Sequence, residues 1–222
     1  QQAARHGTHW LADAHAADRR ASALAGHREP LSYAAGPGTR TVAFRGYAYT
    51  RTPSPVSGAL MTRYDERTPQ IWKVPLRDQI APDVTVEAPR GGYLVPAAQA
   101  ALVADTLRLH GITFQTLTQA DNRAVQSFRA DTATFAARSN EGHQGLAVSG
   151  QWRAETRAVP AGSLFVPITQ PKARLVMAIL EPQAPDSLLQ WGLFNLAFER
   201  KEYMEDYVAE DVAREMLARD PA

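Results

Sequence analysis

The segment Gly91–Thr118, with the sequence GGYLVPAAQAALVADTLRLHGITFQTLT, constrains the fold more than any other part of the chain. A short apolar strand at Tyr93–Val95 leads into a proline, which suits the first turn of a helix. The spacing of apolar residues then predicts a helix from about Ala97 to Leu109, ended by Gly111 and followed by a second strand. Because such crossovers join parallel strands, we expect a βαβ unit over about residues 93–118, with one helix face packed on a sheet.

Short β-rich segments flank this unit, between residues 41 and 87 and between residues 124 and 168. Proline, glycine or aspartate bounds each of them, as is typical of strands and turns. Helical patterns follow over residues 170–182, 186–201 and 202–219. We therefore expect an α+β fold with a mixed β-sheet and C-terminal helices.

The first 26 residues are alanine-rich and polar on most faces, which predicts a surface helix with Trp10 and Leu11 on its apolar stripe. A connector rich in proline and glycine comes next and indicates a boundary near residues 36–39. We predict a helical lead-in over residues 1–36 and an α+β domain over residues 37–222. Since the chain begins with glutamine rather than methionine, we expect a processed protein or a piece of a longer one.

Composition excludes several classes of function. The formal net charge of the 222 residues is +1, so no bulk charge draws the protein to nucleic acid or to an anionic membrane. The absence of cysteine excludes disulfides, thiolate zinc sites and cysteine nucleophiles. No apolar run reaches the ~20 residues of a membrane span. We expect neither a nucleic-acid partner nor a membrane span.

The most chemically suggestive loop is NEGHQG, Asn140–Gly145, which places Glu141 and His143 two residues apart. On an extended loop the two side chains would lie on the same side and could share a proton or a metal ion. The same sequence is also typical of a solvent-exposed hairpin-like loop in which the glycines adopt positive φ angles. Both interpretations stay open at this point.

Other motifs for catalysis or metal binding are weak. His6, His9 and Asp13 fall on one face of the predicted first helix, as zinc ligands could, but solvated side chains have the same spacing. No G-x-S-x-G nucleophile motif and no phosphate-binding loop occurs. We assign no catalytic residue and no metal ligand to this chain.

Two groups of apolar residues suggest binding instead. Tyr47, Tyr49, Trp72 and Trp152 lie on predicted strands, where they serve either a sheet core or a platform for sugars. The segment Glu181–Asn195 has an N-cap signal at Asp186 and carries Trp191 and Phe194, which we expect to contact a core or another domain.

The sequence resembles the C-terminal region of large bacterial zinc carboxypeptidases of the carboxypeptidase A family. The resemblance is carried by RGGYLVPAAQAALVADTLRLHGI, by NEGHQG and by VPAGSLFVPITQPKARLVMAILEPQAPDSLLQWGLFN, and extends from about Phe44 to Met216. That family holds zinc with a His-x-x-Glu pair and a later histidine. No histidine of this chain is followed by glutamate at the third position, so no family catalytic residue is carried over.

The resemblance implies a non-catalytic C-terminal accessory domain that supports or docks on an upstream peptidase domain of the same polypeptide. Zinc would be held in that upstream domain, with no cofactor in this chain, and the protein would be secreted or periplasmic. On this hypothesis the binding residues are Glu141, His143, Trp191 and Phe194. A stand-alone glycan or peptidoglycan module that uses the strand aromatics is the alternative. A compact hydrolase that uses Glu141, His143 and Asp186 is a third hypothesis.

Overall fold

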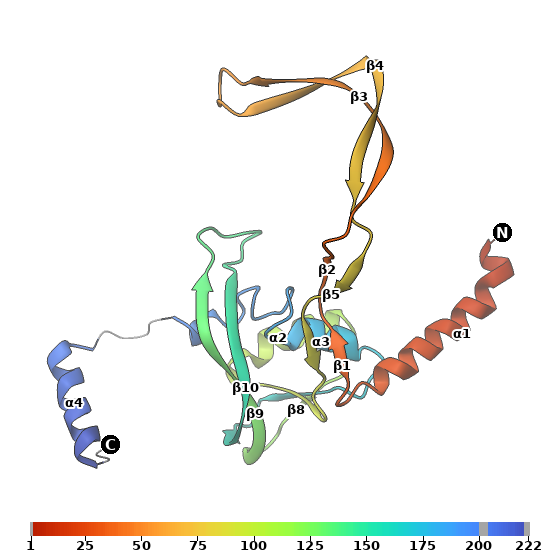
Figure 1. Cartoon of the computed structure of the whole chain (residues 1–222). Helices are drawn as coiled ribbons and strands as arrows, with labels where there is room; N and C mark the ends of the chain where they lie inside the picture. Colours follow the sequence, from red (N-terminus) through yellow and green to blue (C-terminus); the bar gives the residue numbers. More distant parts are fainter. Residues whose placement is uncertain (1, 200–203, 220–222) are drawn as a thin grey trace. The chain divides into compact units, whose positions relative to one another are not determined.

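The computed structural model describes residues 2–199 and 204–219. Its helices are α1 (Gln2–Ser22), α2 (Ala97–Leu109), α3 (Ala173–Leu180) and α4 (Asp206–Arg219), with a 3-10 helix at Asn195–Ala197. Its strands are β1 (Arg28–Pro30), β2 (Tyr33–Ala35), β3 (Arg40–Pro53), β4 (Leu60–Leu76), β5 (Ile80–Pro82), β6 (Thr85–Glu87), β7 (Gly92–Val95), β8 (Gln115–Thr116), β9 (Asp121–Phe135), β10 (Leu146–Val159) and β11 (Leu164–Pro167). The fold is α+β, as predicted (Figure 1).

The chain forms two compact units. One combines the residues up to His27 with those from Ala88 onward and is called the core unit below. The other, residues Arg28–Glu87, is called the ribbon unit. The boundary predicted near residues 36–39 falls inside the ribbon unit, between β2 and β3.

The ribbon unit consists of three nested antiparallel ladders, β1 with β6, β2 with β5 and β3 with β4. The two long strands β3 and β4 pair from one end to the other except at a bulge after Tyr47, where residues 66–68 of β4 have no partner on β3. The only buried residue of this unit is Glu29. A two-stranded ribbon gains most of its stability from packing against something else, so its exposed faces are candidate binding surfaces.

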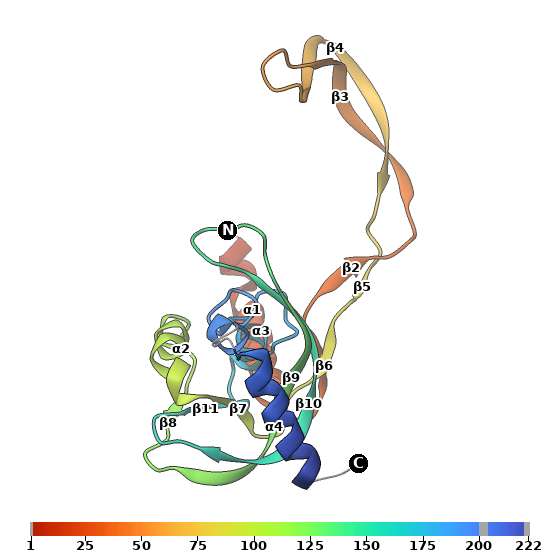
Figure 2. The same cartoon turned by 90° about the vertical axis from the view of Figure 1, so that its left-hand side faces the viewer.

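The core unit is built around a three-stranded sheet in the order β7, β11, β8 (Figure 2). Helix α2 contacts β7 and β11 of this sheet, and α3 contributes further buried apolar side chains to the unit. The largest apolar side chains with essentially no exposed surface are Val103, Leu107, Val166, Ile168, Val176 and Met177. In the same unit β9 and β10 form a long antiparallel hairpin with a bulge between Ser149 and Gly150.

The helix predicted over residues 97–109 is confirmed with those bounds as α2, and Gly111 follows it at a φ of 60°. The strands on either side of it, β7 and β8, are not paired with each other. Each is paired antiparallel with β11, which lies between them. The mixed sheet that we expected is therefore wrong for the described residues, where every ladder is antiparallel, because β11 inserts between two strands that are close in sequence.

Two of the predicted C-terminal helices differ from the structure. Over residues 186–199 the predicted helix is replaced by consecutive turns and the short 3-10 helix, and its last two predicted residues, 200 and 201, lie outside the described part. Its helical pattern is interrupted because Gly192 has a φ of 87° and the Leu188 N–H donates to the Ile179 carbonyl of α3. The last helix begins at Asp206; of its predicted first residues, 202 and 203 lie outside the described part.

The first helix lies on the surface as expected, with Trp10 and Leu11 more than half exposed and Ala21 buried. Within the described ranges, no helix combines the length and the apolar character that crossing a membrane requires.

Candidate functional site

A pocket of about 680 Å³ lies in the core unit between the outer side of α2, the loop around His143 and the segment 186–193. Apolar side chains make up much of its lining, and imidazole and carboxylate groups are interspersed with them. The lining residues are Leu102, Asp105, Thr106, Leu109, His110, Gly142, His143, Gln144, Ile179, Asp186, Leu188, Trp191, Gly192 and Leu193.

Helix α2 presents two apolar faces, and only one of them enters the core. Val103 and Leu107 are fully buried, whereas Leu102 is 58% and Leu109 88% exposed. Leu102 and Leu109 are seven residues apart, close to two helical turns, and therefore lie on the same side of α2. Their apolar surface forms one wall of the pocket.

The loop at the second wall is a two-residue turn. The Asn140 N–H donates to the His143 carbonyl and the His143 N–H donates to the Asn140 carbonyl, each at 2.9 Å. Glu141 and Gly142 have φ angles of 51° and 81°, the positive values that this kind of tight turn requires. The loop is thus not extended at Glu141, and the same-side geometry considered for Glu141 and His143 does not arise from it.

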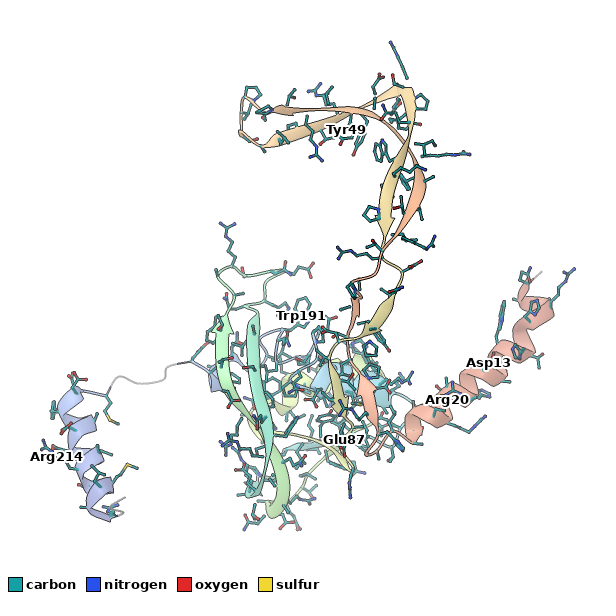
Figure 3. All side chains as sticks on the ribbon, in the orientation of Figure 1. Asp13, Arg20, Tyr49, Glu87, Trp191 and Arg214 are labelled. Atoms are coloured by element: carbon teal, nitrogen blue, oxygen red, sulfur yellow. The ribbon has the colours of Figure 1, made fainter. Side chains whose placement is uncertain are left out.

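Trp191 forms the third wall and contacts His143. Their ring centroids are 5.4 Å apart, with the rings nearly perpendicular at 87°. The Leu146 N–H donates to the Gln190 carbonyl at 2.9 Å, and the Asn195 side-chain amide donates to the Gln144 carbonyl at 2.9 Å. These bonds hold the segment that carries Trp191, which Figure 3 labels, against the loop that carries His143.

The structure brings some of the predicted residues together and separates others. His143, Asp186 and Trp191 line the pocket. Glu141 is exposed on the turn, and Phe194 is half-buried beyond Leu193; neither is among the lining residues. Within the described residues no hydrogen bond or ion pair joins Glu141, His143 and Asp186. Leu102 and Leu109 were not identified as site residues from the sequence. The signal that could have found them is their spacing of seven residues, which gives the helix a second apolar face besides the one that enters the core.

Beside this region, Glu181 is a buried carboxyl group at the end of α3, only 2% exposed. It accepts hydrogen bonds at 3.0 Å from the Tyr93 hydroxyl and at 3.0 Å from the Trp152 indole N–H. Burial raises the pKa of Glu181, and these two hydrogen bonds oppose that rise. Burial, together with the negative charge of Glu181, also raises the pKa of Tyr93. Glu181 thus joins β7, β10 and α3 through polar contacts inside the core unit.

The three side chains on α1 that could serve as zinc ligands do not converge on one point. The His9 imidazole lies 3.2 Å from the Asp13 carboxylate on the exposed face of the helix. His6 stacks on Trp10 instead, with 5.7 Å between ring centroids. In the part of the chain that the structure describes, no group of three or more His, Asp or Glu side chains is arranged to hold a metal ion.

The four predicted strand aromatics divide between the two units. Tyr47, Tyr49 and Trp72 belong to the ribbon unit, where Tyr49 meets Trp72 edge-on at 5.9 Å. Trp152 belongs to the core unit, where it packs on Phe128 at 5.5 Å in addition to its bond with Glu181.

We predict that Gly192→Ala disrupts the pocket. A Cβ at this position would overlap the Gln144 carbonyl oxygen, and the φ of 87° is unfavourable for alanine. We expect a loss of about 1–3 kcal/mol in the free energy of unfolding, measured in urea, with a change in Trp191 fluorescence. Gly145→Ala is the matched control, because its Cβ would meet neighbours at ordinary contact distances of 3.6 and 3.7 Å. Equal stability of the two variants would contradict the assignment.

Comparison of the chain with models of protein families, with curated protein sequences and with solved structures finds no match.

Proposed function

We propose that this chain is a non-catalytic accessory domain that binds a neighbouring protein domain through the pocket of the core unit. The observation that carries the proposal is the arrangement of Leu102, Leu109 and Trp191 around one concavity. Apolar surface of this kind, rimmed by polar groups, is typical of protein interaction sites. Trp191 is the natural anchor, since tryptophan often dominates the binding energy of an interface.

The proposed partner is the catalytic domain of a zinc carboxypeptidase, which hydrolyses C-terminal peptide bonds. The choice of this partner rests on the sequence resemblance described above. On this proposal the partner domain would hold the zinc, and the parent protein would be secreted or periplasmic. Phe194 and Glu141 would then contribute at the margin of the interface, next to the residues that line the pocket. His143 would orient Trp191 through their ring contact.

The test is calorimetric titration of the 222-residue chain with the separately expressed catalytic domain of a zinc carboxypeptidase of this family from the same organism. We expect saturable binding, weakened roughly tenfold or more by Trp191→Ala and by Leu109→Ala, because both side chains would be buried in the complex. Leu11→Ala is the matched control, since Leu11 is exposed on α1 and lies outside the pocket.

Two results would overturn this proposal. One is binding that the pocket substitutions leave unchanged. The other is a chain that by itself contains about one zinc ion and hydrolyses a blocked dipeptide with a free C-terminal carboxylate, as a catalytic zinc site would allow.

The second candidate function is glycan binding by the ribbon unit. It is favoured by the exposure of Tyr47 and Tyr49, which are 42% and 49% accessible on a strand with no core beneath it. Trp72 adjoins Tyr49, so three of the four aromatics named from the sequence lie on β3 and β4. Exposed aromatic rings on a sheet supply flat apolar contact area for a sugar ring.

A further inference from the structure

The paired strands β3 and β4 have two faces of different character. Residues opposite each other in an antiparallel ladder share a face, and alternate residues of one strand do so too. Phe44 is opposite Trp72, and Tyr49 is opposite Tyr64; the four rings contact one another at centroid distances of 5.9–6.2 Å. This first face carries an aromatic cluster in which Phe44, Tyr49 and Tyr64 keep 49–59% of their surface exposed.

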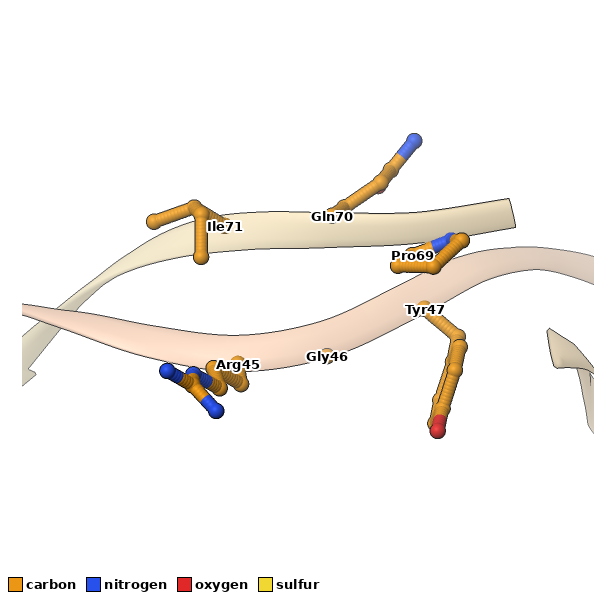
Figure 4. Close-up of a pocket in the computed structure, with 6 residues that line it drawn as sticks. All are labelled: Arg45, Gly46, Tyr47, Pro69, Gln70 and Ile71. Atoms are coloured by element: carbon orange, nitrogen blue, oxygen red, sulfur yellow. The ribbon is translucent and has the colours of Figure 1, made fainter. Parts of the chain in front are cut away.

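The second face has a single aromatic ring beside an unpaired cation. Arg45 is opposite Ile71 and Tyr47 is opposite Pro69, so these four side chains share a face. With Gly46 and Gln70 they line a shallow pocket of about 350 Å³, and Figure 4 shows the Arg45 and Tyr47 side chains extending from the same side of β3. Among the described residues, no carboxylate forms an ion pair with Arg45.

Positive charge is concentrated on this stretch of the chain. Residues 40–76 contain six basic residues, Arg40, Arg45, Arg51, Arg63, Arg67 and Lys73, and two acidic ones, Asp65 and Glu66. The net charge of the stretch is therefore +4, whereas that of the whole chain is +1. A positive local potential attracts an anionic ligand to this stretch, although the net charge of the whole protein is too small to do so.

We propose that this second face binds an acidic glycan, with Tyr47 stacked on a sugar ring and Arg45 paired with the carboxylate of that sugar. The proposal rests on the second candidate function and names its ligand class. A guanidinium group matches a carboxylate with two parallel hydrogen bonds. Pro69 and Ile71 supply apolar contact on the same face.

A sugar fits this pocket better than a nucleobase does. Single-stranded nucleic acids bind to successive aromatic rings with open faces. Here Tyr47 is the single ring in the pocket, and the four rings that contact one another around Trp72 lie outside it, so the pocket itself offers no run of stacking rings.

The experiment is calorimetric titration of the full chain with oligogalacturonate, with a neutral cello-oligosaccharide of equal length and with a single-stranded DNA of equal charge. We expect oligogalacturonate to bind at least roughly tenfold more tightly than either of the other two, because only it offers both a sugar ring and a carboxylate. Added salt should weaken this binding, since the ion pair is exposed.

The variants locate the site on the ribbon. Arg45→Gln and Tyr47→Ala should each weaken oligogalacturonate binding roughly tenfold, whereas Tyr47→Phe should retain it because the ring remains. Arg5→Gln, on exposed α1, is the matched control for loss of one positive charge and should bind like the wild type. Circular dichroism of each variant checks that the strands are intact.

The possible outcomes distinguish failure of the acidic ligand class from failure of glycan binding itself. Equal binding of the neutral oligosaccharide would overturn the acidic ligand class and leave glycan binding in place. No binding of either oligosaccharide would overturn both. Tighter binding of DNA would identify a nucleic-acid surface instead. A loss in Arg5→Gln as large as that in Arg45→Gln would show that the pocket is not the site.

Discussion

Replacing Glu181 by alanine is expected to lower the free energy of unfolding of the core unit by about 3–5 kcal/mol. The carboxyl group is 2% exposed and accepts from the Tyr93 hydroxyl and the Trp152 indole N–H. Its removal leaves two donors without their partner and opens a cavity where three elements meet. A buried donor left unsatisfied costs ~1–3 kcal/mol, and the lost contacts add to this.

Glu181→Gln separates the effect of the hydrogen bonds from that of the charge. The glutamine oxygen can accept from Trp152, and its amide can donate to the Tyr93 oxygen, so both contacts have a counterpart. At acid pH we expect this variant to unfold within about 1 kcal/mol of the wild type. At neutral pH it should be the more stable of the two, because it carries no buried charge.

The direction of the pH dependence follows from the raised pKa of Glu181. Below the ordinary pKa of glutamate, the group is protonated in both the folded and the unfolded chain and contributes no difference. As the pH rises from there through the raised pKa, the unfolded chain ionises first, so the wild type loses stability. Above the raised pKa the loss is complete.

Urea unfolding of wild type and Glu181→Gln between about pH 4 and pH 8 measures this dependence. The difference between the two proteins should grow with pH and then level off. A constant difference across this range would mean that Glu181 ionises as an exposed glutamate does. A Glu181→Ala variant as stable as the wild type would show that the contacts to Tyr93 and Trp152 contribute nothing.

Leu107→Ala is expected to destabilise the core unit by about 3 kcal/mol. Leu107 has no exposed surface and lies on α2, which contacts β7 and β11. Deletion of its terminal groups removes buried apolar area and leaves a void that surrounding side chains fill only in part.

Leu109→Ala, on the same helix, is the matched control. Leu109 is 88% exposed, so the same substitution should change the free energy of unfolding by less than about 0.5 kcal/mol. Chemical denaturation followed by circular dichroism compares the two. Similar losses in both variants would mean that α2 does not bury the face that contains Leu107. Because Leu109→Ala is expected to keep its stability, a loss of binding in this variant would report on the pocket rather than on unfolding.

Helix α2 shows what local sequence signals predict and what they do not. Apolar spacing and Gly111 predicted its bounds of Ala97 and Leu109, because a helix period, a proline before it and a glycine after it are local properties. The same residues could not show that β11 lies between β7 and β8. The pairs between β11 and β7 join residues about 70 positions apart and those between β11 and β8 residues about 50 apart, and no local pattern records either.

The segment around Trp191 shows the opposite case. Its apolar spacing predicted a helix over residues 186–201, and the described residues of this range, 186–199, form turns and a short 3-10 helix instead. The Leu188 N–H bonds to α3 and the Gly192 backbone lies against Gln144, so contacts with distant segments outweigh the local preference for a helix. Those contacts also bring Trp191 to His143.

The sequence by itself determined the α+β class, the bounds of α2, the surface position of α1 and the choice of His143 and Trp191 as residues of interest. These follow from residue type and spacing, which act over a few neighbouring positions. Only the tertiary structure decided that His143 and Trp191 are in contact, that Leu102 and Leu109 complete their pocket, and that Glu181 is buried between Tyr93 and Trp152. Each of these depends on packing between segments far apart in the chain, where burial and hydrogen bonding select one arrangement from many that the local pattern allows.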